Sequence, residues 1–111
     1  MKFSSRLAAI AFCVVMTAPP TASWAAGDPS LGLELYTACA SCHGGDGRST
    51  SMSQYPKIGG QNEAYLVNAL KAYRDGRRQG TFASIMAETA KGLSDQDIVN
   101  LASYVASLAG P

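Results

Sequence analysis

The stretch Cys39-Ala40-Ser41-Cys42-His43 decides how this chain folds. Two thiols three positions apart, with an imidazole directly after the second, are typical of covalent haem c attachment. Each cysteine can add across one haem vinyl group, because the spacing of the thiols matches that of the two vinyls. The histidine is then delivered beneath the ring. The sequence therefore predicts one haem c, with Cys39 and Cys42 as covalent anchors and His43 as an axial iron ligand.

Two other kinds of site use closely spaced cysteines. A thioredoxin-like dithiol needs a strand before the motif, and a zinc site needs a second pair of ligands. No strand pattern precedes the motif. The one further cysteine, Cys13, lies in a segment that has the pattern of an export signal, and His43 is the only histidine. After export the chain cannot build a four-ligand zinc site from cysteine and histidine, so the motif favours haem attachment.

The N-terminal segment has the pattern of an export signal. Two basic residues give a charged start, an apolar stretch follows over residues 7–16, and Ser23-Trp24-Ala25 offers small residues before a cleavage point. The apolar stretch is too short to span a bilayer. A retained membrane anchor is the alternative. We expect a cleaved signal peptide over residues 1–25 and a single haem domain over residues 26–111, located in the periplasm.

The predicted haem domain is small and almost neutral. Without the two basic residues of the leader, the chain has one more acidic than basic residue, which argues against a nucleic-acid partner. It has no tryptophan and no long apolar run, so we expect no stable membrane insertion after cleavage. In a domain of this size a hydrophobic core alone gives only marginal stability. A buried haem would supply the missing apolar core.

The haem motif is preceded by a helix and followed by a long loop. Asp28 directly before Pro29 is typical of a helix start, with the carboxylate as N-cap and the proline ring at the first helical position. Apolar residues three or four apart continue this helix into the motif. From Gly44 to Gln61 the sequence is rich in glycine, serine, threonine and proline. A loop of this length is unusual in a compact domain, and we expect it to wrap around the haem edge.

Three further helical segments follow the loop. Asn62-Glu63 opens a helix that ends before Gly76, and a short helical piece covers residues 84–91. Ser94, with Asp97 three residues later, resembles a capping box. It opens a closing helix with an apolar face, formed by Ile98, Leu101, Ala102, Val105 and Leu108. No strand pattern competes, so we predict an all-α fold of three main helices and a short one around the haem.

The second axial ligand decides between electron transfer and ligand chemistry, because an open position lets small molecules reach the iron. With no second histidine, the candidates are Met52 and Met86. Met52 lies only nine residues after His43, which makes the opposite face of the ring hard to reach. Met86 lies beyond a helix that can carry the chain around the ring edge. We predict Met86 as the ligand; Met52, an open site and a purely structural Met86 are the alternatives.

Residues spread over nearly all of the predicted domain match one family pattern: Gly32, Tyr36, the haem motif, 44–47, 56–61, Tyr65, Leu66, Met86, 93–95, Ile98 and Tyr104. In these residues the chain resembles the class I c-type cytochromes, specifically the small single-haem branch similar to cytochrome c553 and to one half of the dihaem cytochrome c4. The resemblance implies that Gly32 and Tyr36 pack against Tyr104 where the first and last helices cross. It also implies that the Pro56 carbonyl accepts a hydrogen bond from His43, which would orient the imidazole.

These features predict an exported electron carrier rather than an enzyme. It would pass single electrons between a redox protein donor and a redox protein acceptor, as a monomer or in transient complexes. One alternative is a haem enzyme or gas binder with a labile sixth ligand, which would need a polar distal group. Another is a haem subunit of a larger oxidoreductase.

One basic cluster stands out in the sequence: Lys71, Arg74, Arg77 and Arg78. In the first interpretation it is a solvated helix end and turn, because isolated surface charges contribute little. In the second, one arginine pairs with a haem propionate or an acidic partner, because arginine binds a carboxylate through two parallel hydrogen bonds.

Overall fold

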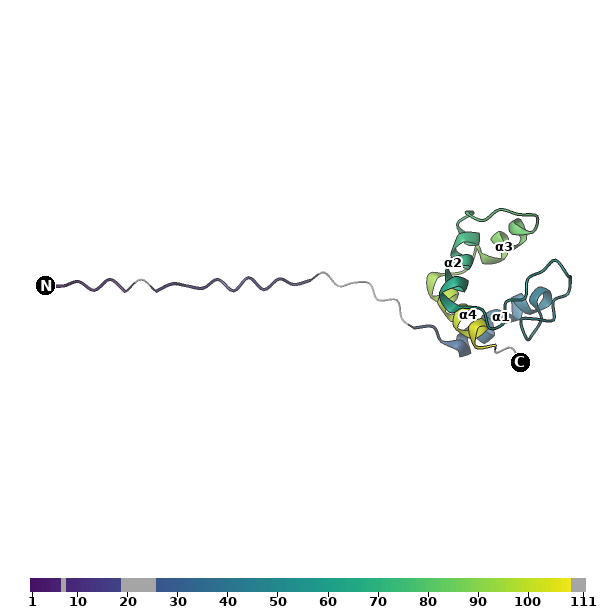
Figure 1. Ribbon diagram of the computed structural model, residues 1–111, viewed down its shortest axis with the longest axis horizontal. Helices are drawn as coiled ribbons and strands as arrows, with labels where there is room; N and C mark the ends of the chain where they lie inside the picture. The colour runs from purple at the N-terminus through teal and green to yellow at the C-terminus, as the bar shows by residue number, and fades with distance from the viewer. Residues whose placement is uncertain (7, 19–25, 109–111) are drawn as a thin grey trace.

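Four helices make up the fold in the computed structural model, which describes residues 1–6, 8–18 and 26–108. They are α1 (Pro29–His43), α2 (Glu63–Arg74), α3 (Ala83–Ala90) and α4 (Asp95–Ser107), and Figure 1 shows their arrangement. The described residues contain no strand. The predicted all-α fold of three main helices and a short one is confirmed.

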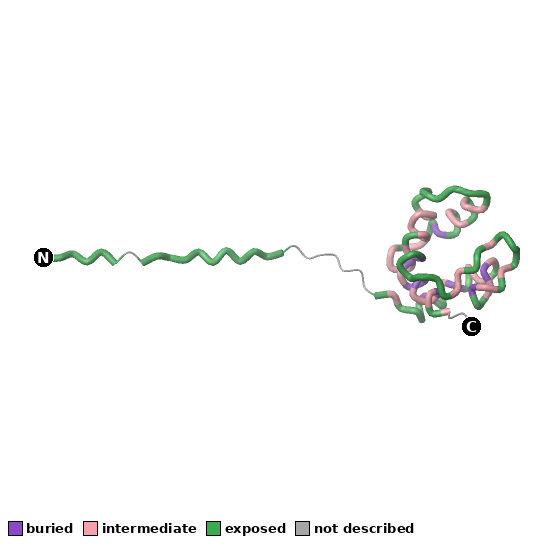
Figure 2. Tube along the Cα trace, viewed as in Figure 1, coloured by how far each residue is buried: buried purple, intermediate pink, exposed green. Residues whose placement is uncertain are grey.

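The N-terminal stretch stands apart from the helices. Residues 1–6 and 8–18 are exposed and extended, and they run away from the helical part in Figures 1 and 2. The expected cleavage site at Ser23-Trp24-Ala25 lies outside the described residues, as do residues 109–111. Within the described part of the chain, no helix has the length and apolar character needed to cross a membrane.

Side-chain caps fix the starts of three helices, as the sequence predicts. The Asp28 carboxylate accepts hydrogen bonds from the first turn of α1, and the Asn62 side chain does the same for α2. Ser94 and Asp97 form a reciprocal capping box at α4, with bonds of 3.0 and 2.9 Å. Each cap stabilises the fold by roughly 1 kcal/mol. Helix α3 differs, because Phe82 occupies its N-cap position and makes no side-chain capping bond.

Helices α1 and α4 cross in close contact at Gly32. A Cβ atom at Gly32 would overlap the carbonyl oxygen of Asn100 and would lie 2.7 Å from Tyr104 Cβ, so the crossing leaves room for glycine alone. One turn further on, the rings of Tyr36 and Tyr104 pack with centroids 5.2 Å apart. The buried Asn100 side chain also accepts a hydrogen bond of 2.9 Å from the Asp28 backbone. The crossing that the resemblance implies is confirmed.

The hydrophobic core lies between α1, α2 and α4 and is small. Its buried members are Tyr36, Leu66, Leu101, Ala102 and Val105, and all of them also line a cavity. Helix α3 packs against α2 but not against α1 or α4. In Figure 1, the α3 ribbon accordingly lies apart from the C-terminal part of α1. Helices α1, α2 and α4 thus form one packed group, and the short helix α3 is attached to it through α2.

Gly32→Ala should destabilise the holoprotein by about 1–3 kcal/mol, the usual cost of overpacking a close contact. Unfolding by guanidinium chloride measures this change. Gly92→Ala is the matched control, because a Cβ there meets nothing within 4 Å and Gly92 does not have a positive φ. The control should keep the wild-type unfolding midpoint, or its midpoint should rise slightly because alanine makes the unfolded chain less flexible. Equal losses in both variants would mean that the crossing tolerates a side chain.

Candidate haem site

All four helices and the long loop enclose a cavity of about 360 Å³, far larger than a bound water needs. The loop contributes residues 54–58 to its wall. Most lining side chains are aliphatic or aromatic. Two basic side chains, Lys57 and Arg78, also line it, whereas no carboxylate among the described residues does. The cavity therefore suits a large apolar group that carries negative charge, which is the chemistry of a haem with its two propionates.

The two motif cysteines present their thiols to this cavity from the last turns of α1. Residues three apart lie on the same face of a helix, which brings Cys39 and Cys42 together. Both are free thiols. Burial raises the pKa of the Cys39 thiol, and the neighbouring Cys42 raises it further. The pair fits the two thioether links of haem c.

The alternatives for the cysteine pair find no support in the fold. The motif lies inside a helix rather than after a strand. Across the part of the chain that the structure describes, no group of three or more His, Cys, Asp or Glu side chains is arranged to hold a metal ion. A thioredoxin-like dithiol and a zinc site are therefore both disfavoured.

His43 ends α1 and is buried, with 6% of its surface exposed. Its Nδ1 lies 2.9 Å from the carbonyl oxygen of Pro56. Because a carbonyl oxygen can only accept, Nδ1 must carry the proton and donate it. The lone pair of Nε2 is then free to bind iron, and the contact fixes the ring orientation. The hydrogen bond that the resemblance implies is confirmed.

The backbone directly after His43 is held by a buried tyrosine. The Tyr36 hydroxyl donates a 2.6 Å hydrogen bond to the carbonyl oxygen of Gly44. Burial raises the pKa of Tyr36 to about 12, with a smaller contribution from Cys39, so the hydroxyl remains a donor over the physiological range. Gly44 has φ +82°, and a Cβ there would lie 2.6 Å from the Ser49 carbonyl oxygen. The helix can therefore turn sharply into the loop without displacing His43.

A carboxylate organises the next turn of this loop. Asp46 accepts hydrogen bonds from the backbone N–H groups of Ser49 and Arg48, at 2.7 and 2.8 Å, and from the Ser49 hydroxyl at 2.8 Å. These donors, the Ser49 N–H first, lower the pKa of Asp46 from 3.8 to about 2. The ionised form of Asp46 is therefore favoured by the folded loop.

Met86 and Met52 have different surroundings. Met86 lines the cavity from α3, whereas His43 lines it from the end of α1. Met52 is 43% exposed in the loop and does not line the cavity. The fold thus brings Cys39, Cys42, His43 and Met86 to one cavity and leaves Met52 outside it.

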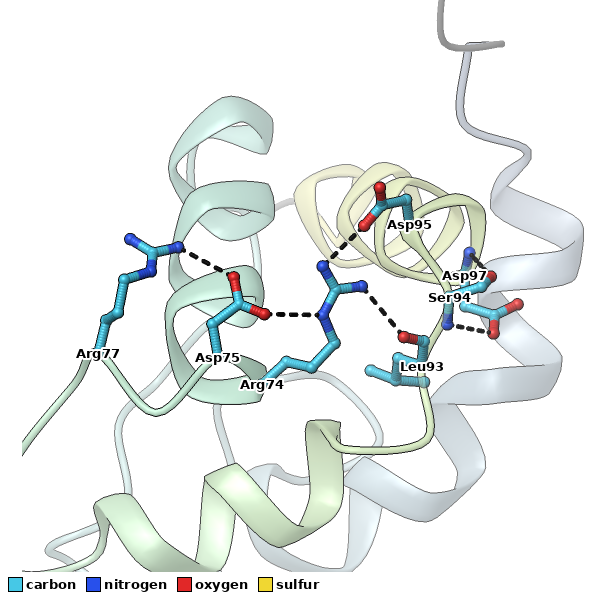
Figure 3. Close-up of polar contacts among 7 residues, drawn as sticks. All are labelled: Arg74, Asp75, Arg77, Leu93, Ser94, Asp95 and Asp97. Carbon is cyan, nitrogen blue, oxygen red and sulfur yellow. Dashed lines mark hydrogen bonds and ion pairs between the residues drawn. The ribbon is translucent and has the colours of Figure 1, made fainter.

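Two members of the basic cluster are engaged in ion pairs, as Figure 3 shows. Arg74 reaches Asp95 at 2.8 Å and Asp75 at 3.2 Å, and it donates a 3.1 Å hydrogen bond to the Leu93 carbonyl oxygen. It therefore joins the end of α2 to the start of α4 and is not a solvated helix end. Arg77, whose side chain is 62% exposed, pairs with Asp75 at 3.3 Å. For Arg77 the interpretation as a solvated turn holds.

Arg78 differs from both, because it lines the cavity. Its guanidinium lies over the ring of Tyr73, 4.5 Å from the ring centroid. Stacking of this kind holds an arginine in one orientation while leaving its N–H donors available. Of the three arginines, Arg78 is the one placed to meet an anionic group in the cavity.

Two aromatic residues of the cavity wall were not anticipated from the sequence. Tyr55 and Phe82 both line the cavity, and their rings meet edge to face with centroids 5.5 Å apart. The signal that could have indicated them is their position: Tyr55 directly precedes Pro56, and Phe82 lies one helical turn before Met86.

The hydrogen bonds of Asp46 predict a pH dependence of stability. The lowered pKa in the fold means that the ionised carboxylate stabilises the fold above pH 3.8, and that this contribution is lost as the pH falls through about 2. Asp46→Asn should remove it. The difference in unfolding free energy between wild type and variant, measured in denaturant, should be constant near neutral pH and shrink below pH 4. A difference that persists undiminished in acid would contradict a carboxylate stabilised by these donors.

Comparisons with known proteins agree with this site. Residues 30–109 match the family model described as cytochrome c. Over 82 residues the chain is 44% identical to cytochrome c-554(548) of Halomonas halodenitrificans, which covers 74% of this chain and 98% of that protein. It is 39% identical over 83 residues to cytochrome c4 of Pseudomonas aeruginosa, which covers 75% of this chain but only 39% of that protein.

The solved structures give the same result. Reduced recombinant cytochrome c4 from Pseudomonas stutzeri has a TM-score of 0.66 and 33% identity, with 78% of this chain and 53% of that chain covered. This chain therefore spans about half the length of that structure. With the motif cysteines at the cavity wall and the match over residues 30–109, the chain belongs to the cytochrome c family and carries one covalently attached haem c.

Proposed function

We propose that the chain is an exported carrier of single electrons, with His43 and Met86 as the two axial ligands of the haem iron. The observation that supports this most is that both side chains line the same cavity from different helices, together with Cys39 and Cys42. Haem c supplies an iron that cycles between Fe(II) and Fe(III). If protein side chains fill both axial positions, no place for a substrate remains at the metal.

The side chains around the cavity suit this role. The hydrogen bond to Pro56 keeps the His43 ring in one orientation, so the imidazole need not move when the iron changes charge. The thioether of Met86 favours Fe(II) and would raise the potential. Within the described residues, neither a carboxylate nor a second imidazole lines the cavity. A haem enzyme would use such a group next to a bound substrate, and the carrier function is therefore favoured.

Export also belongs to this proposal. We infer that residues 1–25 are a signal peptide and that residues 26–111 act as the mature haem domain in the periplasm. The charged start and the short apolar stretch of the leader support this inference. In that compartment thiols are readily oxidised to disulfides, so Cys39 and Cys42 must be kept reduced until the haem is attached.

A second candidate function is a haem subunit within a larger oxidoreductase. The thiosulfate dehydrogenase electron acceptor of Thiomonas intermedia is 34% identical over 87 residues. The cytochrome subunit of sulfide dehydrogenase of Chlorobaculum tepidum is 37% identical over 79 residues. Both names link related domains to electron transfer, one as an acceptor and one as a subunit. Isolation of the native protein as a lone monomer would favour the free carrier.

Met86→Ala should abolish the far-red absorption band of an Fe(III)–Met bond and lower the midpoint potential, because a weaker or absent sulfur ligand no longer favours Fe(II). The shift would lie within the roughly 0.8 V range that axial ligands govern. Absorption spectra and potentiometric titration of the holoprotein measure both changes. Met52→Ala is the matched control and should leave them unchanged. If the band and the potential survive the loss of Met86, the ligand assignment is wrong.

Arg78→Gln should lower the midpoint potential, because a positive charge beside a propionate disfavours Fe(III). Arg77→Gln removes an equal charge from an exposed, ion-paired position, where solvent screens it. The midpoint potential of the Arg77→Gln variant should therefore change less than that of the Arg78→Gln variant. Redox titration of both variants at the same ionic strength makes the comparison. Equal shifts would contradict a specific role of Arg78 toward the haem.

A further inference from the structure

We propose that Tyr55 and Phe82 act as positioning residues that hold Met86 on the iron, so that loss of their contact opens the sixth coordination position. This inference rests on the proposed ligand pair. The two rings, called here the aromatic clasp, meet at 79° with centroids 5.5 Å apart. Edge-to-face contacts at this distance are favourable beyond the area that they bury.

The aromatic clasp joins two segments of the chain, each of which lies next to one of the proposed ligands. Tyr55 directly precedes Pro56, whose carbonyl accepts the hydrogen bond from His43. Phe82 directly precedes α3, which carries Met86. Helix α3 packs against α2 but has no packing contact with α1. The ring contact therefore links the loop that holds His43 to the start of the helix that carries Met86, and this link does not involve α2.

At the N-terminal end of α3 no side chain caps the helix. The N-cap position, where Ser, Thr, Asp or Asn usually accepts a backbone hydrogen bond, is occupied by Phe82 and makes none through its side chain. The preceding residues 75–81 are all exposed. In the first turn, the N–H groups of Ile85 and Met86 lie 3.2 and 3.4 Å from the Phe82 carbonyl oxygen, and the second distance is long for a hydrogen bond. At the other end of α3, Ala90 is fully buried.

The difference between the two ends of α3 predicts how Met86 leaves the iron. With its C-terminal end anchored at Ala90, α3 can move at its N-terminal end once the aromatic clasp opens. The Phe82 side chain makes no capping bond at that end, and its ring contacts Tyr55 instead. The energy of such a ring pair corresponds to a change of roughly 2- to 10-fold in the population of the open form. The aromatic clasp would therefore set how often the carrier becomes accessible to small ligands.

The experiment follows imidazole binding to the oxidised holoprotein by stopped flow. At high imidazole concentration the observed rate reaches the rate at which Met86 leaves the iron. Tyr55→Leu and Phe82→Leu should each raise this limiting rate roughly 2- to 10-fold. The double variant should not exceed the larger single effect by much, because both substitutions remove the same contact.

Two control variants separate the aromatic clasp from a general effect on the cavity wall. Tyr65→Leu makes the same substitution at another tyrosine that lines the cavity, on α2, and should raise the limiting rate less than Tyr55→Leu does. Tyr55→Phe retains the ring and should keep the wild-type rate. If Tyr65→Leu accelerates binding as much as Tyr55→Leu, or if Tyr55→Phe behaves like Tyr55→Leu, the proposal is overturned.

The wild-type protein distinguishes failure of this inference from failure of the proposed function. A rate that rises in proportion to imidazole without a limit would mean that no protein ligand has to leave, and both proposals would fail. If Tyr55→Leu and Phe82→Leu have the same limiting rate as wild type, the proposed ligand pair is retained. Only the role of the aromatic clasp is then overturned. A limiting rate raised in both variants supports the inference.

Discussion

The hydrogen bond between His43 and the Pro56 carbonyl is the contact on which the rest of the site depends. It assigns the ring proton to Nδ1 and so leaves Nε2 free for iron. It also ties the long loop back to the end of α1, which places Tyr55 in the cavity wall. Around it, Tyr36 and Asp46 hold the turn that leaves the helix. A single orientation of the imidazole therefore follows from contacts on both sides of the haem motif.

The same arrangement explains how a domain this small is stable. The buried apolar residues lie where α1, α2 and α4 meet, and these side chains also form a wall of the cavity. The crossing at Gly32 brings α1 and α4 into close contact beside this wall. A haem bound against this wall would extend the core and would connect α3 to α1 and α4, which it does not otherwise contact. Folding and cofactor binding therefore depend on the same surfaces.

Local signals in the sequence were sufficient for most of the fold. Asp28 and Ser94 act within one helical turn, and the haem motif is a single pentapeptide, so neither needs knowledge of tertiary contacts. Contacts between distant segments could not be predicted in this way. Arg74 reads as one charge of a basic cluster until Asp95 is seen beside it. Tyr65 has the spacing of an apolar-face residue in its helix, yet it is 52% exposed because that face borders the cavity.

The central claim is that one imidazole and one thioether bind the iron in both oxidation states. X-ray absorption at the iron edge of the purified holoprotein tests it most directly, because this method distinguishes sulfur from nitrogen in the first coordination sphere. We expect one sulfur and five nitrogen ligands in both the oxidised and the reduced protein, with the sulfur lost in the variant that lacks Met86. An iron with no sulfur ligand, or with only five ligands in either state, would contradict the account.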